Sequence, residues 1–216
     1  GAPLLGRLPT PAPLGPDAFA ERLEEGVVLD TRMELGFSSA HVPGAQSIWL
    51  GGLSSFAGWF LPYDTPLLLV GETDDVEPQV RQLVRMGHDD VEGFLSGGML
   101  RWHMAGRASG RVPTYTVQDV CGYLDRGHDI PILDVRSDDE LRSQGAIPGA
   151  LHIHVTQLPE RLDEIPNGNE ALHVFCGSGL RSMVAASYLA RKGWEEPAVI
   201  LGGLSAWNST TCPLKL

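Results

Sequence analysis

The chain of 216 residues is long enough for one large domain or for two modest domains that each bury a core. Its hydrophobic content of 43% and charged content of 20% are typical of soluble globular proteins, and no apolar segment is long enough to cross a bilayer. The formal net charge of -11 argues against a nucleic acid or an anionic membrane as a partner, because both carry negative charge.

The N-terminal segment, residues 1–16, is rich in proline and predicts a semi-rigid, extended linker, with a plain disordered terminus as the alternative. The chain begins with Gly1 rather than with methionine, and it shows no signal-peptide pattern. We therefore expect a piece of a longer protein, in which the linker follows an upstream domain.

A first domain is predicted over residues 17–108, where short apolar strands alternate with helices. Asp17 is a candidate N-cap for a helix that ends at Gly26. The pattern then predicts, in chain order, a strand at 27–32, a turn at 42–45, a short segment at 46–50, a strand at 67–70, a helix at 78–86, and a strand at 91–95 followed by Gly97-Gly98. This alternation indicates an α/β domain with a mainly parallel sheet and helices on both of its faces.

Residues 109–216 repeat this order and predict a second domain of the same kind. A helix capped by Thr116 opens it, and Asp134 and Trp207 correspond to Asp30 and Trp102 of the first half at a nearly constant spacing. Repetition at the length of a whole domain indicates a duplicated domain rather than a short solenoid repeat.

The second domain contains a loop with the features of an anion-binding nucleophile site, Cys176-Gly177-Ser178-Gly179-Leu180-Arg181. An apolar strand is predicted just before it at 171–175, and a helix follows it as far as Gly193. At such a junction the backbone N–H groups and the helix N-terminus can surround one point, and Arg181 adds a full positive charge and a planar fork of donors. The sequence therefore predicts a stabilised thiolate at Cys176 rather than a cysteine buried only for packing.

Four motifs in order resemble the rhodanese sulfurtransferases. They are Leu133-Asp134-Val135-Arg136, Ala146-Ile147-Pro148-Gly149-Ala150, Cys176-x-x-Gly179-x-Arg181 and Gly202-Gly203-Leu204-Ser205-Ala206-Trp207. The resemblance implies two tandem rhodanese-like domains and a sulfurtransferase in which a Cys176 persulfide carries sulfane sulfur. The donor would be thiosulfate or a low-molecular-weight persulfide, and the acceptor a thiol, sulfite or cyanide.

Cys176 and Arg181 are the expected catalytic residues. The remaining loop residues are expected to contact the substrate, namely Gly177, Ser178, Gly179, Leu180 and Ser182. The expected ligands are small sulfur-containing anions or thiol persulfides, and the reaction requires no metal or organic cofactor in this chain.

The first copy lacks this chemistry. Gly71 aligns with Cys176, and the residues that follow, Glu72-Thr73-Asp74-Asp75-Val76, include three carboxylates and no arginine. Because these carboxylates would repel an anion, we predict a catalytically inactive first domain with a structural role. It would pack against the second domain, shape the entrance to its pocket, or present it to an upstream partner. A cation site made by Glu72, Asp74 and Asp75 is an alternative for which no further ligands are evident.

The three cysteines are widely spaced, so they form neither a disulfide framework nor a zinc pattern and favour a reduced, cytoplasmic setting. Cys121 is expected to pack in the core, because it lies on the apolar side of its predicted helix. Cys212 is a candidate resolving partner for Cys176, although nothing in the sequence brings the two together.

Two further pairs of side chains have both a structural and a functional interpretation. His152 and His154 would share one face of a strand and suggest a metal, but without a third ligand two separate polar contacts explain them. Asp134 and Arg136 lie where α/β sheets place ligands. We expect them to form an internal ion pair, because the first copy keeps both residue types while it loses the nucleophile.

Two other functions compete with sulfur transfer. Phosphatases and arsenate reductases related to rhodanese also use cysteine and arginine, but their loop holds five residues between them, whereas four separate Cys176 from Arg181. The shorter loop leaves less room for a tetrahedral oxyanion. A non-catalytic scaffold, in which both domains only bind partners, is the second alternative.

The arrangement also resembles the C-terminal part of metallo-β-lactamase-fold/rhodanese fusion proteins. The resemblance rests on the proline-rich entry, on the inactive copy with Gly58-Trp59-Phe60-Leu61-Pro62-Tyr63-Asp64, and on the active copy that follows. It implies an upstream domain similar to an iron-dependent persulfide dioxygenase. Any iron ligands would lie in that domain, outside these residues.

Overall fold

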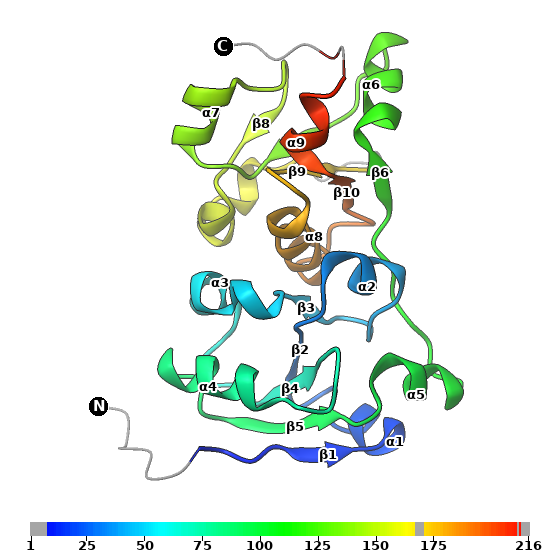
Figure 1. The fold of residues 1–216 in the computed structure, drawn as a ribbon, viewed down its shortest axis with the longest axis vertical. Coiled ribbons are helices and arrows are strands. Elements are labelled where there is room, and N and C mark those ends of the chain that lie inside the picture. Colours follow the sequence, from blue (N-terminus) through cyan, green and yellow to red (C-terminus); the bar gives the residue numbers. More distant parts are fainter. Residues whose placement is uncertain (1–7, 167–170, 211, 213–216) are drawn as a thin grey trace. The chain divides into compact units, whose positions relative to one another are not determined.

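Each half of the chain forms a compact α/β unit in the computed structural model, which describes residues 8–166, 171–210 and 212 (Figure 1). The boundary between the two units falls between Arg111 and Val112. Each unit contains one five-stranded sheet, in which every pair of neighbouring strands is parallel, with helices around it.

The first unit orders its strands β1-β5-β4-β2-β3. Its elements are β1 (Ala12–Leu14), α1 (Pro16–Ala20), β2 (Val27–Asp30), α2 (Glu34–Ser39), β3 (Gln46–Ser47), η1 (Leu50–Gly52), α3 (Leu53–Phe60), β4 (Leu67–Val70), α4 (Glu77–Arg85), β5 (Val91–Leu95) and α5 (Gly98–Met104). The central strand β4 has four consecutive apolar residues that are at most 1% exposed, as expected for a strand covered on both faces.

The second unit orders its strands β6-β10-β9-β7-β8. Its elements are β6 (Thr114–Thr116), α6 (Val117–Asp125), β7 (Ile132–Asp134), α7 (Asp138–Gln144), β8 (Leu151–His152), η2 (Val155–Glu160), η3 (Leu162–Glu164), β9 (His173–Phe175), α8 (Leu180–Arg191), β10 (Ala198–Leu201) and α9 (Gly203–Trp207). When corresponding strands are matched, this order is the same as that of the first unit. The predicted duplication of an α/β domain is therefore confirmed.

The N-terminus differs from the sequence-based expectation at two places. Ala12–Leu14, inside the predicted linker, forms the edge strand β1 and pairs in parallel with β5. An edge strand tolerates Pro13, because the missing N–H of proline interrupts no central ladder. Helix α1 begins at Pro16 with Gly15 as its N-cap, so Asp17 is not the capping residue. Asp17 instead pairs with Arg107, with 2.5 Å between the carboxylate and the guanidinium.

The expectation that the cysteines form no disulfide is wrong, because Cys121 and Cys212 are bonded to each other. They lie 91 positions apart, which hides the pairing in the sequence. The fold brings them together because β6 and β10 are parallel neighbours that lead into α6 and α9. Cys121 lies in α6 and Cys212 follows α9, so Cys212 is not a partner of Cys176, the free cysteine. The wide spacing of the three cysteines is therefore no evidence for a reducing compartment.

We expect Cys121→Ala to lower the free energy of unfolding by about 2–5 kcal/mol, because the bond closes a long loop of the unfolded chain. Urea unfolding checks this value, and Cys212→Ala should have the same effect with no further loss in the double variant. Alkylation after unfolding without a reductant should label Cys176 alone. Labelling of all three cysteines in the oxidised protein would contradict the pairing.

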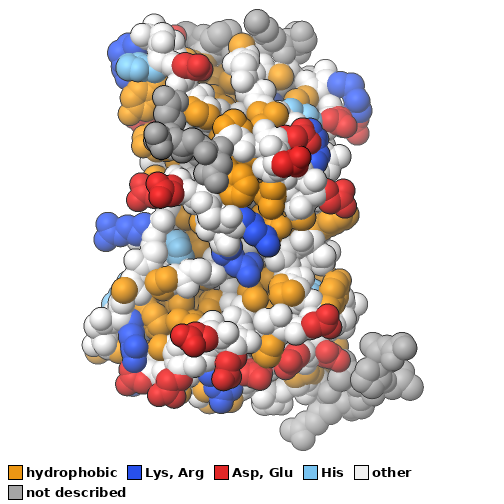
Figure 2. Space-filling model, turned by 180° about the vertical axis from the view of Figure 1, so that it is seen from behind, with side chains coloured by type: hydrophobic (Ala, Val, Ile, Leu, Met, Phe, Trp, Pro, Cys, Tyr) orange, Lys and Arg blue, Asp and Glu red, His pale blue; other side chains and the backbone are white. Residues whose placement is uncertain are grey.

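The surface of the protein carries many acidic side chains, in line with its composition. Acidic side chains are spread over the face shown in Figure 2, as the net charge of -11 leads one to expect. Among the described residues, no helix combines the length and the apolar character that a membrane span requires.

Candidate functional site

The loop that contains Cys176 connects β9 to α8 in the second unit. Cys176 follows the buried strand β9 directly, and α8 begins at Leu180, so the predicted strand, loop and helix are confirmed. Gly179 has φ of +121°, a backbone conformation that L side chains rarely adopt. This conformation directs the N–H of Gly179 at Cys176 Sγ, with the two atoms 3.1 Å apart. The loop thus provides one backbone donor to the sulfur.

The carbonyl groups of the loop are held by the start of α9. Leu204 N–H donates to the Cys176 carbonyl at 3.0 Å, and Gly202 N–H donates to the Ser178 carbonyl, also at 3.0 Å. Because the N–H and C=O of one peptide point in opposite directions, these bonds turn the following amides of the loop away from α9. The N–H groups of Gly202 and Leu204 therefore set the direction of the loop amides, a role that the sequence did not indicate.

The other predicted substrate-contacting residues lie around the same loop. Cys176 has no exposed surface, Gly177 is half-buried and Ser178 is exposed. Leu180 is half-buried at the start of α8. Ser182 is fully buried in the first turn of α8, and its hydroxyl has no hydrogen-bond partner among the described residues.

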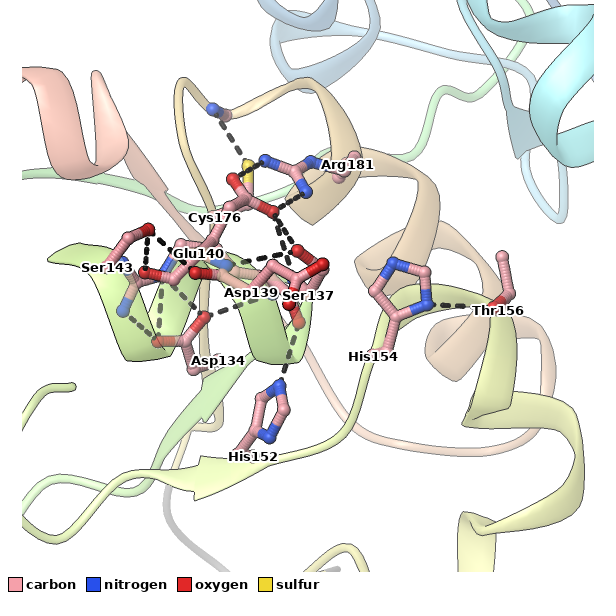
Figure 3. A network of polar contacts seen from close by, with 12 residues as sticks. Asp134, Ser137, Asp139, Glu140, Ser143, His152, His154, Thr156, Cys176 and Arg181 are labelled. Carbon is pink, nitrogen blue, oxygen red and sulfur yellow. Dashed lines mark hydrogen bonds and ion pairs between the residues drawn. The ribbon is translucent and has the colours of Figure 1, made fainter. Parts of the chain in front are cut away.

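Arg181 reaches back from α8 and binds a residue that the sequence analysis missed, Glu140 of α7. Arg181 Nη1 donates to Glu140 Oε2 at 2.6 Å, and Nη2 donates to Oε1 at 2.7 Å (Figure 3). Hydrogen bonds from Arg181 hold the pKa of Glu140 at about 2, although burial acts in the opposite direction. The carboxylate is therefore ionised at neutral pH, and the guanidinium of the site is paired.

Helix α7 fixes Glu140 through a capping box. Glu140 N–H donates to Ser137 Oγ at 3.3 Å, and Ser137 N–H donates back to Glu140 Oε2 at 2.9 Å. The Ser-x-x-Glu spacing at 137–140 was the signal in the sequence that could have located this helix. It could not have shown that the same carboxylate reaches Arg181, because 41 positions separate the two residues.

The predicted internal ion pair of Asp134 and Arg136 is confirmed. Both side chains are at most 1% exposed, and Arg136 Nη2 lies 2.6 Å from Asp134 Oδ2. The same nitrogen donates to the Gly145 carbonyl at 2.9 Å. The first unit repeats the arrangement with Asp30 and Arg32, again at 2.6 Å. The pair thus belongs to the frame of each domain and lies beneath the site in the second one.

His152 and His154 each make the separate polar contacts that the sequence analysis favoured. A ring nitrogen of His152 lies 2.8 Å from the Arg136 carbonyl, and one of His154 lies 2.8 Å from Thr156 Oγ1 (Figure 3). Burial and the nearby Arg181 guanidinium lower the pKa of His154, which favours a neutral imidazole beside the loop. Among the described residues, no group of three or more His, Cys, Asp or Glu side chains could hold a metal ion.

In the corresponding loop of the first unit, acidic side chains accept hydrogen bonds from neighbouring groups of the chain. Asp74 accepts hydrogen bonds from Gly97 N–H at 2.8 Å and from Ser96 Oγ at 2.9 Å. Gly97 corresponds to Gly202, whose N–H donates to the Ser178 carbonyl of the loop in the second unit. Glu72 accepts the Met33 N–H at 3.2 Å, so its carboxylate and that of Asp74 both have partners within the chain.

Comparisons with known proteins identify the family of both units. The family described as "Rhodanese-like domain" matches residues 15–105 and 116–210. The sulfurtransferase of Allochromatium vinosum is 34% identical over 86 residues, which cover 40% of this chain and 78% of that protein. The thiosulfate sulfurtransferase GlpE of Coxiella burnetii is 30% identical over 86 residues, with coverage of 40% and 78%.

Among solved structures, a rhodanese-like domain protein from Staphylococcus aureus is 29% identical, with 49% of this chain and 100% of that chain covered and a TM-score of 0.42. The family match extends over both units, and both show the same strand order. The chain therefore belongs to the rhodanese family and consists of two tandem rhodanese-like domains.

Proposed function

We propose that the second unit is a sulfurtransferase in which Cys176 carries sulfane sulfur as a persulfide. The observation that carries the proposal is the Gly179 N–H at 3.1 Å from the sulfur, in a loop whose carbonyls are tied to α9. A backbone donor aimed at the sulfur stabilises negative charge there, both on the thiolate and on the persulfide formed from it. Sulfurtransferases among the relatives support the same reaction class.

The reaction that we propose exchanges one S–S bond for another. The Cys176 thiolate attacks the outer sulfur of thiosulfate or of a low-molecular-weight persulfide and forms a new S–S bond. The old S–S bond breaks, and its electron pair leaves with sulfite or with the thiolate of the donor. A thiol, sulfite or cyanide then removes the sulfur from Cys176. The atoms and electrons balance without a metal or organic cofactor in this chain.

The phosphatase alternative is disfavoured by the site. Four residues separate Cys176 from Arg181, and the Arg181 guanidinium is already bound by the Glu140 carboxylate. A phosphoryl group at the sulfur would need that guanidinium, and it would meet a negative charge beside it. A binding-only role is the alternative that the fully buried Cys176 sulfur favours.

One experiment separates the three functions. The full chain is incubated with thiosulfate and, separately, with glutathione persulfide, and its intact mass is measured before and after cyanide is added. We expect Cys176 to gain the mass of one sulfur atom and to lose it to cyanide. If Cys176 gains no mass with either donor, the binding scaffold is favoured. The same protein is also incubated with p-nitrophenyl phosphate, and hydrolysis of this ester without any gain of sulfur would favour the phosphatase.

The resemblance to fusion proteins supports a wider setting. We infer that a metallo-β-lactamase-fold domain precedes this chain in the whole protein and holds any iron, and that the inactive first unit presents the second to it. The reactions of such a pair would share a pool of persulfide and sulfite. A reducing, cytoplasmic setting stays part of this proposal for the sake of the Cys176 thiolate, although the Cys121–Cys212 disulfide favours an oxidising one.

A further inference from the structure

The pair of Arg181 and Glu140 borders the point where a donor must meet Cys176. A β-carbon placed on Gly177 would lie 3.0 Å from Arg181 Nη2 and 3.7 Å from Glu140 Oε1. The guanidinium and the carboxylate therefore both lie close to the loop residue next to the nucleophile, and Figure 3 shows them face to face beside Cys176. Glu140 is part of the wall of the site, although it comes from another helix.

Glu140 cancels the charge that the sequence analysis assigned to the site. Its carboxylate is ionised at neutral pH and takes two hydrogen bonds from the guanidinium, so the pair together carries no net charge. The remaining attraction for an anion comes from the loop amides and from the N-terminus of α8, which supplies about half a positive charge. The two neighbouring carboxylates of α7, Asp138 and Asp139, are 71% and 90% exposed, so water screens their charges and Glu140 is the carboxylate that acts on the site.

The two classes of donor place different charges on this site. Thiosulfate is a dianion, so its reaction with the Cys176 thiolate gathers three negative charges around the loop. A persulfide brings at most one negative charge, as R–S–S⁻, and its electrophilic form R–S–SH brings none. When R–S–SH reacts, its proton leaves with the R–S group as a thiol. A site in which the Arg181 guanidinium is already matched by a carboxylate suits the second donor better.

We propose that Glu140 is a positioning residue that orients Arg181 and sets the donor preference of the site, so that persulfides of low charge react with Cys176 faster than thiosulfate does. This inference rests on the proposed sulfur transfer and narrows its substrate class. The capping box of α7 and the two bonds to Arg181 hold the carboxylate in place from opposite sides.

The test is the rate of persulfide formation on Cys176 in the full chain, measured with thiosulfate and with 2-hydroxyethyl persulfide. Glu140→Gln keeps the size of the side chain but removes its charge. We expect it to raise the ratio of the thiosulfate rate to the persulfide rate by about tenfold or more, the effect of one charge removed at close range. Glu140→Asp keeps the charge and should keep the wild-type ratio, even where both rates fall.

Two control variants separate charge selection from structure. Asp139→Asn removes a charge from the same turn of α7, but Asp139 pairs with Arg142 and not with Arg181. Asp119→Asn removes the carboxylate that has the same capping-box position in α6 as Glu140 has in α7. Both should leave the ratio unchanged.

Three outcomes would overturn the inference. One is a Glu140→Gln protein in which both rates change by the same factor, and another is a ratio that Asp139→Asn shifts equally. The third is a wild-type chain that prefers thiosulfate. A wild-type chain that takes sulfur from neither donor would instead overturn the proposed function and the inference together.

Discussion

Gly203→Ala is expected to lower the rate of persulfide formation on Cys176 by about a hundredfold or more, the cost of misplacing a reacting group by roughly 1 Å. A β-carbon on Gly203 would lie 2.2 Å from the Cys176 carbonyl oxygen, 2.6 Å from Gly177 C and 2.7 Å from Ser178 N. All three contacts are with backbone atoms, so no side chain can turn aside to relieve them. The loop itself must move, and the Gly179 N–H would move with it. Single-turnover kinetics with either sulfur donor measures the loss.

The duplicated domain supplies a matched control for this variant. Gly98 corresponds to Gly203 and has a similar backbone conformation, with φ of +57° against +48°. A β-carbon there would meet only the Gly71 carbonyl, at an ordinary contact distance of 3.8 Å. Gly98→Ala should therefore cost about 1–2 kcal/mol of stability through its backbone conformation alone and leave the rate at Cys176 unchanged. Equal losses of rate in the two variants would show that contact with the loop is not the cause.

The sequence was sufficient to predict the elements whose signal is local. Apolar runs predicted β4, β5 and β10, and the motif around Cys176 predicted the strand, loop and helix that now form the candidate site. The nearly constant spacing between the two copies predicted the duplication, which the equal strand orders confirm.

The sequence was insufficient wherever two distant segments meet. The carboxylate of Glu140 and the guanidinium of Arg181 are 41 positions apart, and only the parallel sheet brings their helices together. The disulfide of Cys121 and Cys212 was missed for the same reason. A local sequence motif indicates which residues can take part in chemistry. It does not show which residue from a distant segment neutralises their charge. The guanidinium of the site was therefore predicted as a free charge, although the fold pairs it.

Asp134→Asn is the variant for which we expect the largest loss of stability, because it leaves the Arg136 guanidinium buried without a counter-charge. Arg136 is fully buried, it lies over the Phe175 ring at 5.1 Å, and its Nη1 has no hydrogen-bond partner among the described residues. Removing one partner of such a pair costs about 3–5 kcal/mol, a large part of the stability of a domain. Urea unfolding of the full chain measures this loss.

The loss of the Asp134 charge should also reach the nucleophile. Val135 N–H, between the two charged residues, donates to the Phe175 carbonyl at 2.8 Å, and Phe175 immediately precedes Cys176. This hydrogen bond joins β7 to β9 at the point where the Cys176 loop begins. Because the loss of the Asp134 charge destabilises the end of β7, we expect it also to displace the end of β9, which positions the Cys176 sulfur. Asp30→Asn makes the same change in the first unit and should destabilise the protein without lowering the rate at Cys176. If Asp134→Asn unfolds at the wild-type urea concentration, the buried pair does not support the fold in the way we argue.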